Sequence, residues 1–247
     1  MKIIKIALAI LLVASCAQQK KEQKAEKTVM EEPVEKQQNE WEVLFDGTSF
    51  DDWHFYNSGG VEAPWKLEDG AMVFYPPEEY PEGMSYNIVT DKEYTNFVLS
   101  LEWKVSEGGN SGIFWGVLED EKFGQPYQTG PEIQVLDDER HPDAKNGTTH
   151  QAGALYDMIA PSEKVVKPAG QWNAVELTVN HQTNEGAVVL NGTKVVEFPV
   201  HGEAWDAMVV DSKFSDWEGF GVYQTGKIGL QDHGDMVAYR NIKIKEL

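Results

Sequence analysis

The feature that most constrains the fold is an alternating run at residues 97–105, Phe-Val-Leu-Ser-Leu-Glu-Trp-Lys-Val. Every odd-numbered position in this run is apolar, whereas positions 100, 102 and 104 are polar. Successive side chains of a β-strand point to opposite faces, while a helix repeats every 3.6 residues. The run therefore predicts a strand with one face buried in a core.

Shorter runs of the same kind recur through the rest of the chain, separated by clusters of Gly, Pro, Asn and Asp. Asn191-Gly192 is typical of a tight hairpin between two of them. One helix is predicted at residues 201–211, and no strand–helix–strand rhythm is present. The pattern predicts an all-β domain at residues 41–247, a two-sheet β-sandwich or jelly roll. The other predicted strands are 42–45, 71–74, 111–117, 132–136, 172–181, 187–190, 194–198, 227–231 and 237–245.

The first sixteen residues are predicted to be a targeting segment. Two lysines precede a short apolar run that ends at Leu-Val-Ala-Ser-Cys16, which resembles a bacterial lipobox with Cys16 as the lipidated residue. Residues 17–40 are rich in Lys, Glu and Gln and predict a disordered tether. Ala17 after the cysteine favours a lipid anchor in the outer membrane of the cell envelope. An ordinary cleaved signal peptide with an incidental cysteine is the alternative.

Charge and cysteine content exclude several classes of partner and site. The formal net charge is −20, which disfavours nucleic acid because the phosphate backbone is also negative. Since Cys16 is the only cysteine, an intramolecular disulfide and any multi-cysteine metal site are excluded.

Two polar side chains share one face of the predicted strand at residues 132–136. Ile133 and Val135 point to one side, so Glu132 and Gln134 share the other, about 7 Å apart along the strand. A carboxylate beside an amide suits binding of sugar hydroxyls or acid–base catalysis. The alternative is a solvent-exposed outer face.

A second polar pair occurs near the C-terminus, where Gln231 and His233 share a face opposite Leu230. The neighbouring Asp232 and Asp235 are expected to raise the pKa of His233, which would keep it available as an acid or base. The alternative is a histidine in an exposed turn.

An acidic loop follows the strand at residues 132–136. Asp137, Asp138 and Asp143 could supply oxygen ligands for Ca²⁺, although an acidic loop on an acidic protein is the simpler interpretation. No HxH or HExxH spacing is present, so no metal cofactor is predicted.

Aromatic side chains near the polar strand ends could form a platform for a sugar ring. These are Trp115, Tyr127 and Tyr156, although a sandwich core of this size also needs large aromatic residues. Asn110 is expected first in a turn and second as a contact to the ligand.

Several motifs, in order along the chain, resemble the 3-keto-disaccharide hydrolase domain family, which has a concanavalin A-like lectin/glucanase fold. The resemblance extends over residues 41–247. The motifs are LFDGTSFDDW (44–53), GNSGIF (109–114), GPEIQVLDD (130–138), AGALY (152–156), KPAGQWN (167–173), LNG (190–192), GLQDHG (229–234) and YRNI (239–242).

The resemblance implies hydrolysis of 3-keto-glycosides by proton abstraction at C2, elimination of the C1 substituent and addition of water. Such a reaction needs a base near C2, a donor for the ketone and an acid for the leaving oxygen. Glu132 and His233 are predicted to transfer protons, and Gln134 and Gln231 to orient the sugar or stabilise the enolate. The predicted substrate contacts are Asp137, Asn110, Trp115 and Tyr156.

The sequence departs from the family pattern at Gly116, where many relatives carry an arginine. Any contact of that arginine with an anion or keto oxygen is absent, so the choice of substrate could differ. Two other functions stay open: a non-catalytic, lectin-like carbohydrate-binding domain, and a conventional glycosidase acting on unoxidised glycosides.

Overall fold

The computed structural model describes residues 40–80 and 85–247. The predicted signal peptide, the lipidated Cys16 and the tether up to residue 39 lie outside these ranges. No helix in the described part of the chain is long and apolar enough to span a membrane.

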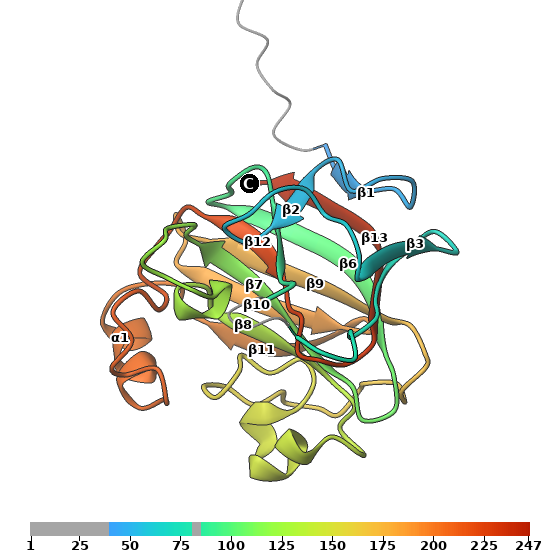
Figure 1. Ribbon diagram of the computed structural model, residues 1–247. Coiled ribbons are helices and arrows are strands. Elements are labelled where there is room, and N and C mark those ends of the chain that lie inside the picture. The colour runs from blue at the N-terminus through green and yellow to red at the C-terminus, as the bar shows by residue number, and fades with distance from the viewer. Residues whose placement is uncertain (1–39, 81–84) are drawn as a thin grey trace, which may run out of the picture. The chain divides into compact units, whose positions relative to one another are not determined.

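The larger of two antiparallel sheets has eight strands and contains the long alternating run (Figure 1). The run forms β6, whose odd-numbered side chains are buried while the even-numbered ones are partly exposed. In spatial order the sheet contains β11 (Thr193–Phe198), β10 (Glu185–Leu190), β9 (Asn173–Asn180), β6 (Phe97–Val105), β13 (Val237–Glu246), β4 (Ala71–Phe74) and β3 (Trp65–Glu68), and β1 (Glu42–Phe45) also pairs with β13.

The smaller sheet has five strands and carries four of the predicted site residues, Asn110, Trp115, Glu132 and Gln134. Its central strand is β12, which comes late in the chain and lies between β5 and β7. In spatial order the sheet contains β2 (Trp53–Phe55), β5 (Ile88–Thr90), β12 (Lys227–Leu230), β7 (Asn110–Val117) and β8 (Glu132–Leu136).

The main core lies between the two sheets. Leu99 and Trp103 of β6 belong to the same buried cluster as Ile113, Ile133 and Val135 of the smaller sheet. Burying these apolar faces against each other is the main favourable contribution to folding. The predicted all-β, two-sheet sandwich is confirmed.

Four short helices lie in the connecting segments of the described chain. The predicted helix is present as α1 (Glu203–Val210). Three 3₁₀ helices lie on either side of β8 in the chain: η1 (Pro126–Gln128), η2 (Pro142–Asn146) and η3 (Thr148–His150).

Three strands were not predicted from the sequence. β2, β3 and β5 are three or four residues long, which is too short for alternation to stand out. Their pairing with β4, β5 and β12 stabilises them instead.

Candidate active site

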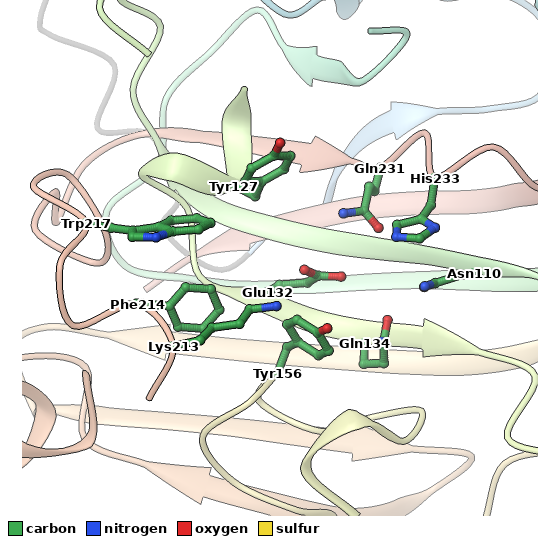
Figure 2. A pocket seen from close by; sticks show the side chains of 10 residues that line it. All are labelled: Asn110, Tyr127, Glu132, Gln134, Tyr156, Lys213, Phe214, Trp217, Gln231 and His233. Carbon is green, nitrogen blue, oxygen red and sulfur yellow. The ribbon is translucent and has the colours of Figure 1, made fainter. Parts of the chain in front are cut away.

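A pocket lies on the smaller sheet, on the face turned away from the main core (Figure 2). It brings together Glu132 and Gln134 of β8 with Gln231 and His233, which follow β12. The alternative of a solvent-exposed face at Glu132 and Gln134 is wrong, because both side chains are buried. The lining residues are Asn110, Tyr127, Glu132, Gln134, Tyr156, Lys213, Phe214, Trp217, Gln231 and His233.

Glu132 provides a carboxylate at the centre of the pocket (Figure 2). It begins β8, where Ile133 points into the core and turns the Glu132 side chain the other way. The residue is only 8% exposed. Burial raises the pKa of Glu132 to about 8; the nearby Lys213 opposes this shift and Asp143 adds to it. A carboxyl group with this pKa can both take and return a proton near neutral pH.

Gly112 of β7 makes room for this carboxylate. Gly112 pairs with Gln134 across the two strands, next to the pairing of Phe114 with Glu132. A Cβ atom at position 112 would overlap the Glu132 carboxyl group. The glycine is therefore required for the observed position of the carboxylate.

Three buried amide side chains surround the carboxylate. Asn110, Gln134 and Gln231 are 3%, 2% and 7% exposed. Within the described residues, Asn110 Oδ1 and Gln231 Oε1 have no hydrogen-bond partner. Because a buried polar atom without a partner is costly, these oxygens favour a ligand in the pocket.

His233 lies beside Gln231 at one side of the pocket (Figure 2). The prediction that its aspartate neighbours raise its pKa is wrong. Desolvation and the nearby His141 lower the pKa of His233, and together they outweigh the opposing effect of Asp235. The imidazole is therefore neutral near pH 7, with one nitrogen able to donate and the other able to accept.

Lys213 and Tyr156 form the opposite side, and a chain of hydrogen bonds holds both in place. The Tyr156 hydroxyl donates to Asp143 Oδ2 at 3.0 Å. His150 bridges Asp143 Oδ1 at 2.9 Å and Asp157 Oδ1 at 3.0 Å. Asp157 Oδ2 in turn accepts the backbone N–H of Lys213 at 2.7 Å. The Lys213 ammonium lies 4.0 Å from the centre of the Tyr156 ring.

Aromatic rings form the remaining wall. Phe214 stacks on Phe220 with the ring centroids 3.8 Å apart, and Trp217 packs edge-on against Phe214 at 5.1 Å. The ring centroids of Tyr127 and Trp217 are 5.8 Å apart. Flat apolar surfaces beside a few polar groups are typical of a small-molecule site.

Two predicted substrate contacts lie elsewhere. Trp115 is 4% exposed and packs against Phe198 with a centroid distance of 5.6 Å, so it belongs to the core. β7 is buried on both faces, and Trp115 points to the face opposite Asn110. Asp137 is buried outside the pocket, where its carboxylate accepts the backbone N–H groups of Gly108 and Glu139.

The acidic loop does not form the calcium site considered from the sequence. Asp138 accepts the backbone N–H of Ala152 at 2.8 Å. Asp143 accepts from Asn146 at 2.7 Å, besides its contacts to His150 and Tyr156. With Asp137 engaged as well, each of the three carboxylates stabilises local structure.

Sequence reasoning missed three lining residues: Lys213, Phe214 and Trp217. They follow α1 in a segment with no alternation. The only signal was a lysine beside aromatic residues in a strongly acidic chain.

Comparison with known proteins identifies the family. The family model described as "3-keto-alpha-glucoside-1,2-lyase-like domain" matches residues 40–245. The chain belongs to this family. The resemblance predicted from the motifs is thereby confirmed.

Two relatives illustrate how far the similarity extends. A 3-keto-disaccharide hydrolase of Bacteroides thetaiotaomicron is 37% identical over 229 residues, which cover 83% of this chain and 78% of the relative. The crystal structure of a candidate glycosyl hydrolase from Parabacteroides distasonis is 34% identical, with a TM-score of 0.75 over 84% of this chain and 94% of that chain. These relatives support the prediction that this family member is a carbohydrate hydrolase.

Proposed function

We propose that this protein hydrolyses 3-keto-glycosides, including 3-keto-disaccharides, by elimination followed by hydration. The observation that carries the proposal is the buried Glu132 carboxyl group, whose pKa of about 8 suits proton transfer at neutral pH. The family and the Bacteroides relative support the same class of substrate.

In the first half of the reaction, Glu132 takes the proton from C2 of the sugar. A ketone at C3 acidifies this proton, because the negative charge moves onto the C3 oxygen as an enolate. The electron pair then forms the C1–C2 double bond, the C3 carbonyl returns, and the bond from C1 to the leaving oxygen breaks. The leaving oxygen takes a proton and departs as an alcohol.

In the second half, water adds to the resulting enone. The water oxygen bonds to C1, Glu132 protonates C2 after its proton has exchanged with solvent, and the remaining water proton replaces the one that the leaving oxygen took. The products are a free 3-keto sugar and the alcohol, so the net reaction is hydrolysis. One carboxylate is sufficient, in contrast to the carboxylate pair of ordinary glycosidases.

The surrounding side chains match the charges that develop. Lys213 is the only lysine or arginine among the lining residues, and it lies on the Tyr156 side of Glu132 (Figure 2). Its positive charge favours an enolate in a partly dehydrated pocket. Gln134, Gln231 and Asn110 orient the hydroxyl groups of the sugar. His233 transfers a proton at the other side, either directly or through a bound water molecule.

The test compares p-nitrophenyl 3-keto-glucoside with the parent glucoside, for wild type and Glu132→Gln, in D₂O. Elimination and hydration place deuterium at C2 of the 3-keto sugar, whereas direct displacement at C1 leaves hydrogen there. Incubating the product alone with enzyme measures background exchange. We expect wild type to cleave only the 3-keto substrate and to label C2.

Each other outcome points to a different function. Cleavage of the parent glucoside at a similar rate would indicate a conventional glycosidase. Binding of the 3-keto sugar without cleavage, unchanged in Glu132→Gln, would indicate a lectin-like domain. Either result would overturn the proposal.

A further inference from the structure

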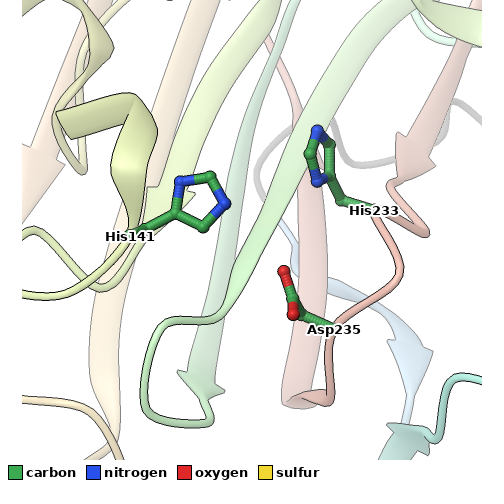
Figure 3. A group of neighbouring side chains, drawn as sticks. All are labelled: His141, His233 and Asp235. Atoms are coloured by element: carbon green, nitrogen blue, oxygen red, sulfur yellow. The ribbon is translucent and has the colours of Figure 1, made fainter. Parts of the chain in front are cut away.

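Three side chains with metal-binding chemistry meet at the edge of the pocket (Figure 3). His141 precedes η2, while His233 and Asp235 lie in the loop between β12 and β13. Each offers one nitrogen or oxygen atom, and these atoms all lie within 4.8 Å of one another. The histidines are far apart in sequence, which is why no spacing motif revealed the group.

The surroundings of this group contain acceptors that lack a positive partner. Asn110 Oδ1 and Gln231 Oε1 are buried without a hydrogen-bond partner in the described part of the chain. Both residues line the pocket together with His233. The backbone N–H of Asn110 also donates to Asp235 Oδ2 at 3.2 Å, which places Asn110 next to the group. Unpaired buried oxygens beside two imidazoles and a carboxylate are what a bound cation would explain.

We propose that His141, His233 and Asp235 bind a divalent first-row transition metal ion, such as Zn²⁺ or Co²⁺. Two imidazole nitrogens and one carboxylate oxygen match these ions, whereas Ca²⁺ and Mg²⁺ prefer oxygen ligands alone. Ligand atoms about 2.0–2.2 Å from such an ion lie closer together than 4.8 Å, so small side-chain rotations complete the site.

Metal binding requires one local rearrangement, at His141. In the structure its Nδ1 accepts the backbone N–H of Asp143 at 3.1 Å, so this nitrogen carries no proton. Figure 3 shows the other ring nitrogen pointing towards His233. Coordination through Nε2 moves the proton to Nδ1 and breaks the contact with Asp143. The Asp143 amide therefore reports directly on binding.

The position of the ion also suggests a role, which rests on the proposed function. His233 lines the pocket, so an open coordination position would face the sugar. An ion there would stabilise negative charge on the leaving oxygen, at the side of the pocket opposite Lys213. A water molecule on the ion would then carry the proton that we assigned to the His233 side of the pocket.

The experiment titrates metal-free protein, prepared with EDTA and without a histidine tag, with Co²⁺ alone and follows the visible absorption of the bound ion. Asp235→Asn keeps an oxygen that can accept from Asn110 but removes the charge, and His141→Gln removes a nitrogen ligand. His201→Gln is the matched control, since His201 contacts the His181 carbonyl away from the group. Zn²⁺ competition and the Asp143 amide NMR signal give independent readouts.

We expect one Co²⁺ per chain, displaced by Zn²⁺, with a shift of the Asp143 amide signal. Asp235→Asn and His141→Gln should each weaken binding by about 10²-fold or more, and His201→Gln should not. No absorption band, or equal affinity in wild type and Asp235→Asn, overturns the proposal. If His141→Gln does not fold, Asp235→Asn decides alone.

The proposed metal site and the proposed function can be contradicted separately. One Co²⁺ bound without turnover of a 3-keto-glucoside would leave the metal site in place and contradict the proposed function. Full turnover in EDTA-treated protein that binds no Co²⁺ would do the reverse.

Discussion

Gly112 lies directly beneath the carboxyl group of Glu132. This carboxyl group fills the space that the side chain of any other residue at position 112 would occupy. This close contact predicts how a single methyl group added at position 112 affects activity. Gly112→Ala should displace the carboxylate from its position above β7 and lower kcat/KM for a 3-keto-glucoside by about 10²-fold, the typical cost of an ångström-scale misplacement.

The control for this variant is Gly60→Ala, since nothing lies within 4 Å of a Cβ atom at that position. Circular dichroism should show both variants folded. Unchanged kcat/KM in folded Gly112→Ala would mean that the position of the Glu132 carboxylate does not matter.

The second prediction concerns the pH dependence of activity. Glu132 must be ionised to act as the base, and burial holds its pKa at about 8. The kcat/KM of wild type should therefore rise with pH up to about 8 and then level off. Glu132→Gln should lower kcat by about 10²–10⁴-fold and lose this rise, whereas the exposed Glu176→Gln should keep it. A profile that falls between pH 6 and 8 would instead make Glu132 the acid.

The third prediction is that the stability of the folded protein falls as pH rises, whereas its activity increases. Because the pKa of Glu132 is raised in the folded protein, its stabilising contribution is present below about pH 4.5 and is lost as pH rises through about 8. Glu132→Gln removes the cost of burying an ionised carboxylate at this position. The free energy of unfolding of the variant should therefore exceed that of wild type at pH 8.5 by an amount on the order of 5 kcal/mol, seen as a higher Tm, and match it at pH 4.5. Equal Tm values at both pH values would show that the carboxylate is not desolvated.

His150 should act by positioning rather than by contacting substrate. It bridges Asp143, which holds Tyr156, and Asp157, which holds the backbone of Lys213. His150→Ala should loosen both pocket residues and lower kcat/KM by about 10–10²-fold. His201→Ala, away from the pocket, is the control. Normal kinetics in His150→Ala would show that Tyr156 and Lys213 are held without the bridge.

The lipid anchor is a separate prediction, made from residues outside the described part of the chain. Cys16→Ala should shift the protein from the detergent phase to the aqueous phase in Triton X-114 partitioning of cell extracts, because acylation would hold it at the membrane. The Tm of the released protein should equal that of wild type. Partitioning of Cys16→Ala into detergent as strong as wild type would rule out Cys16 as the anchor.

The sequence predicted what depends on alternation within one strand. Leu99 and Trp103 are in the core, and Glu132 and Gln134 share a face, because neighbouring side chains on a strand must point in opposite directions. The prediction that Trp115 contacts substrate was wrong for a related reason. Both faces of β7 are buried, so alternation alone could not tell the core face from the pocket face.

The rest depends on contacts between distant segments. The path of the Lys213 segment is set by the bond from its backbone to Asp157 and by the stacking of Phe214 on Phe220. The lowered pKa of His233 comes partly from His141, which belongs to another loop. No local pattern encodes either effect.

The place of β12 in the smaller sheet has a consequence for synthesis. β12 comes late in the sequence but lies between β5 and β7 in the sheet. Just after β12, the backbone N–H of Gln231 donates to the carbonyl oxygen of Gly112 in β7 at 2.9 Å. A ribosome-bound chain that ends before residue 227 therefore lacks the middle of the sheet on which the pocket is built. The pocket can assemble, and the protein can begin to act, only after β12, Gln231 and His233 have been synthesised.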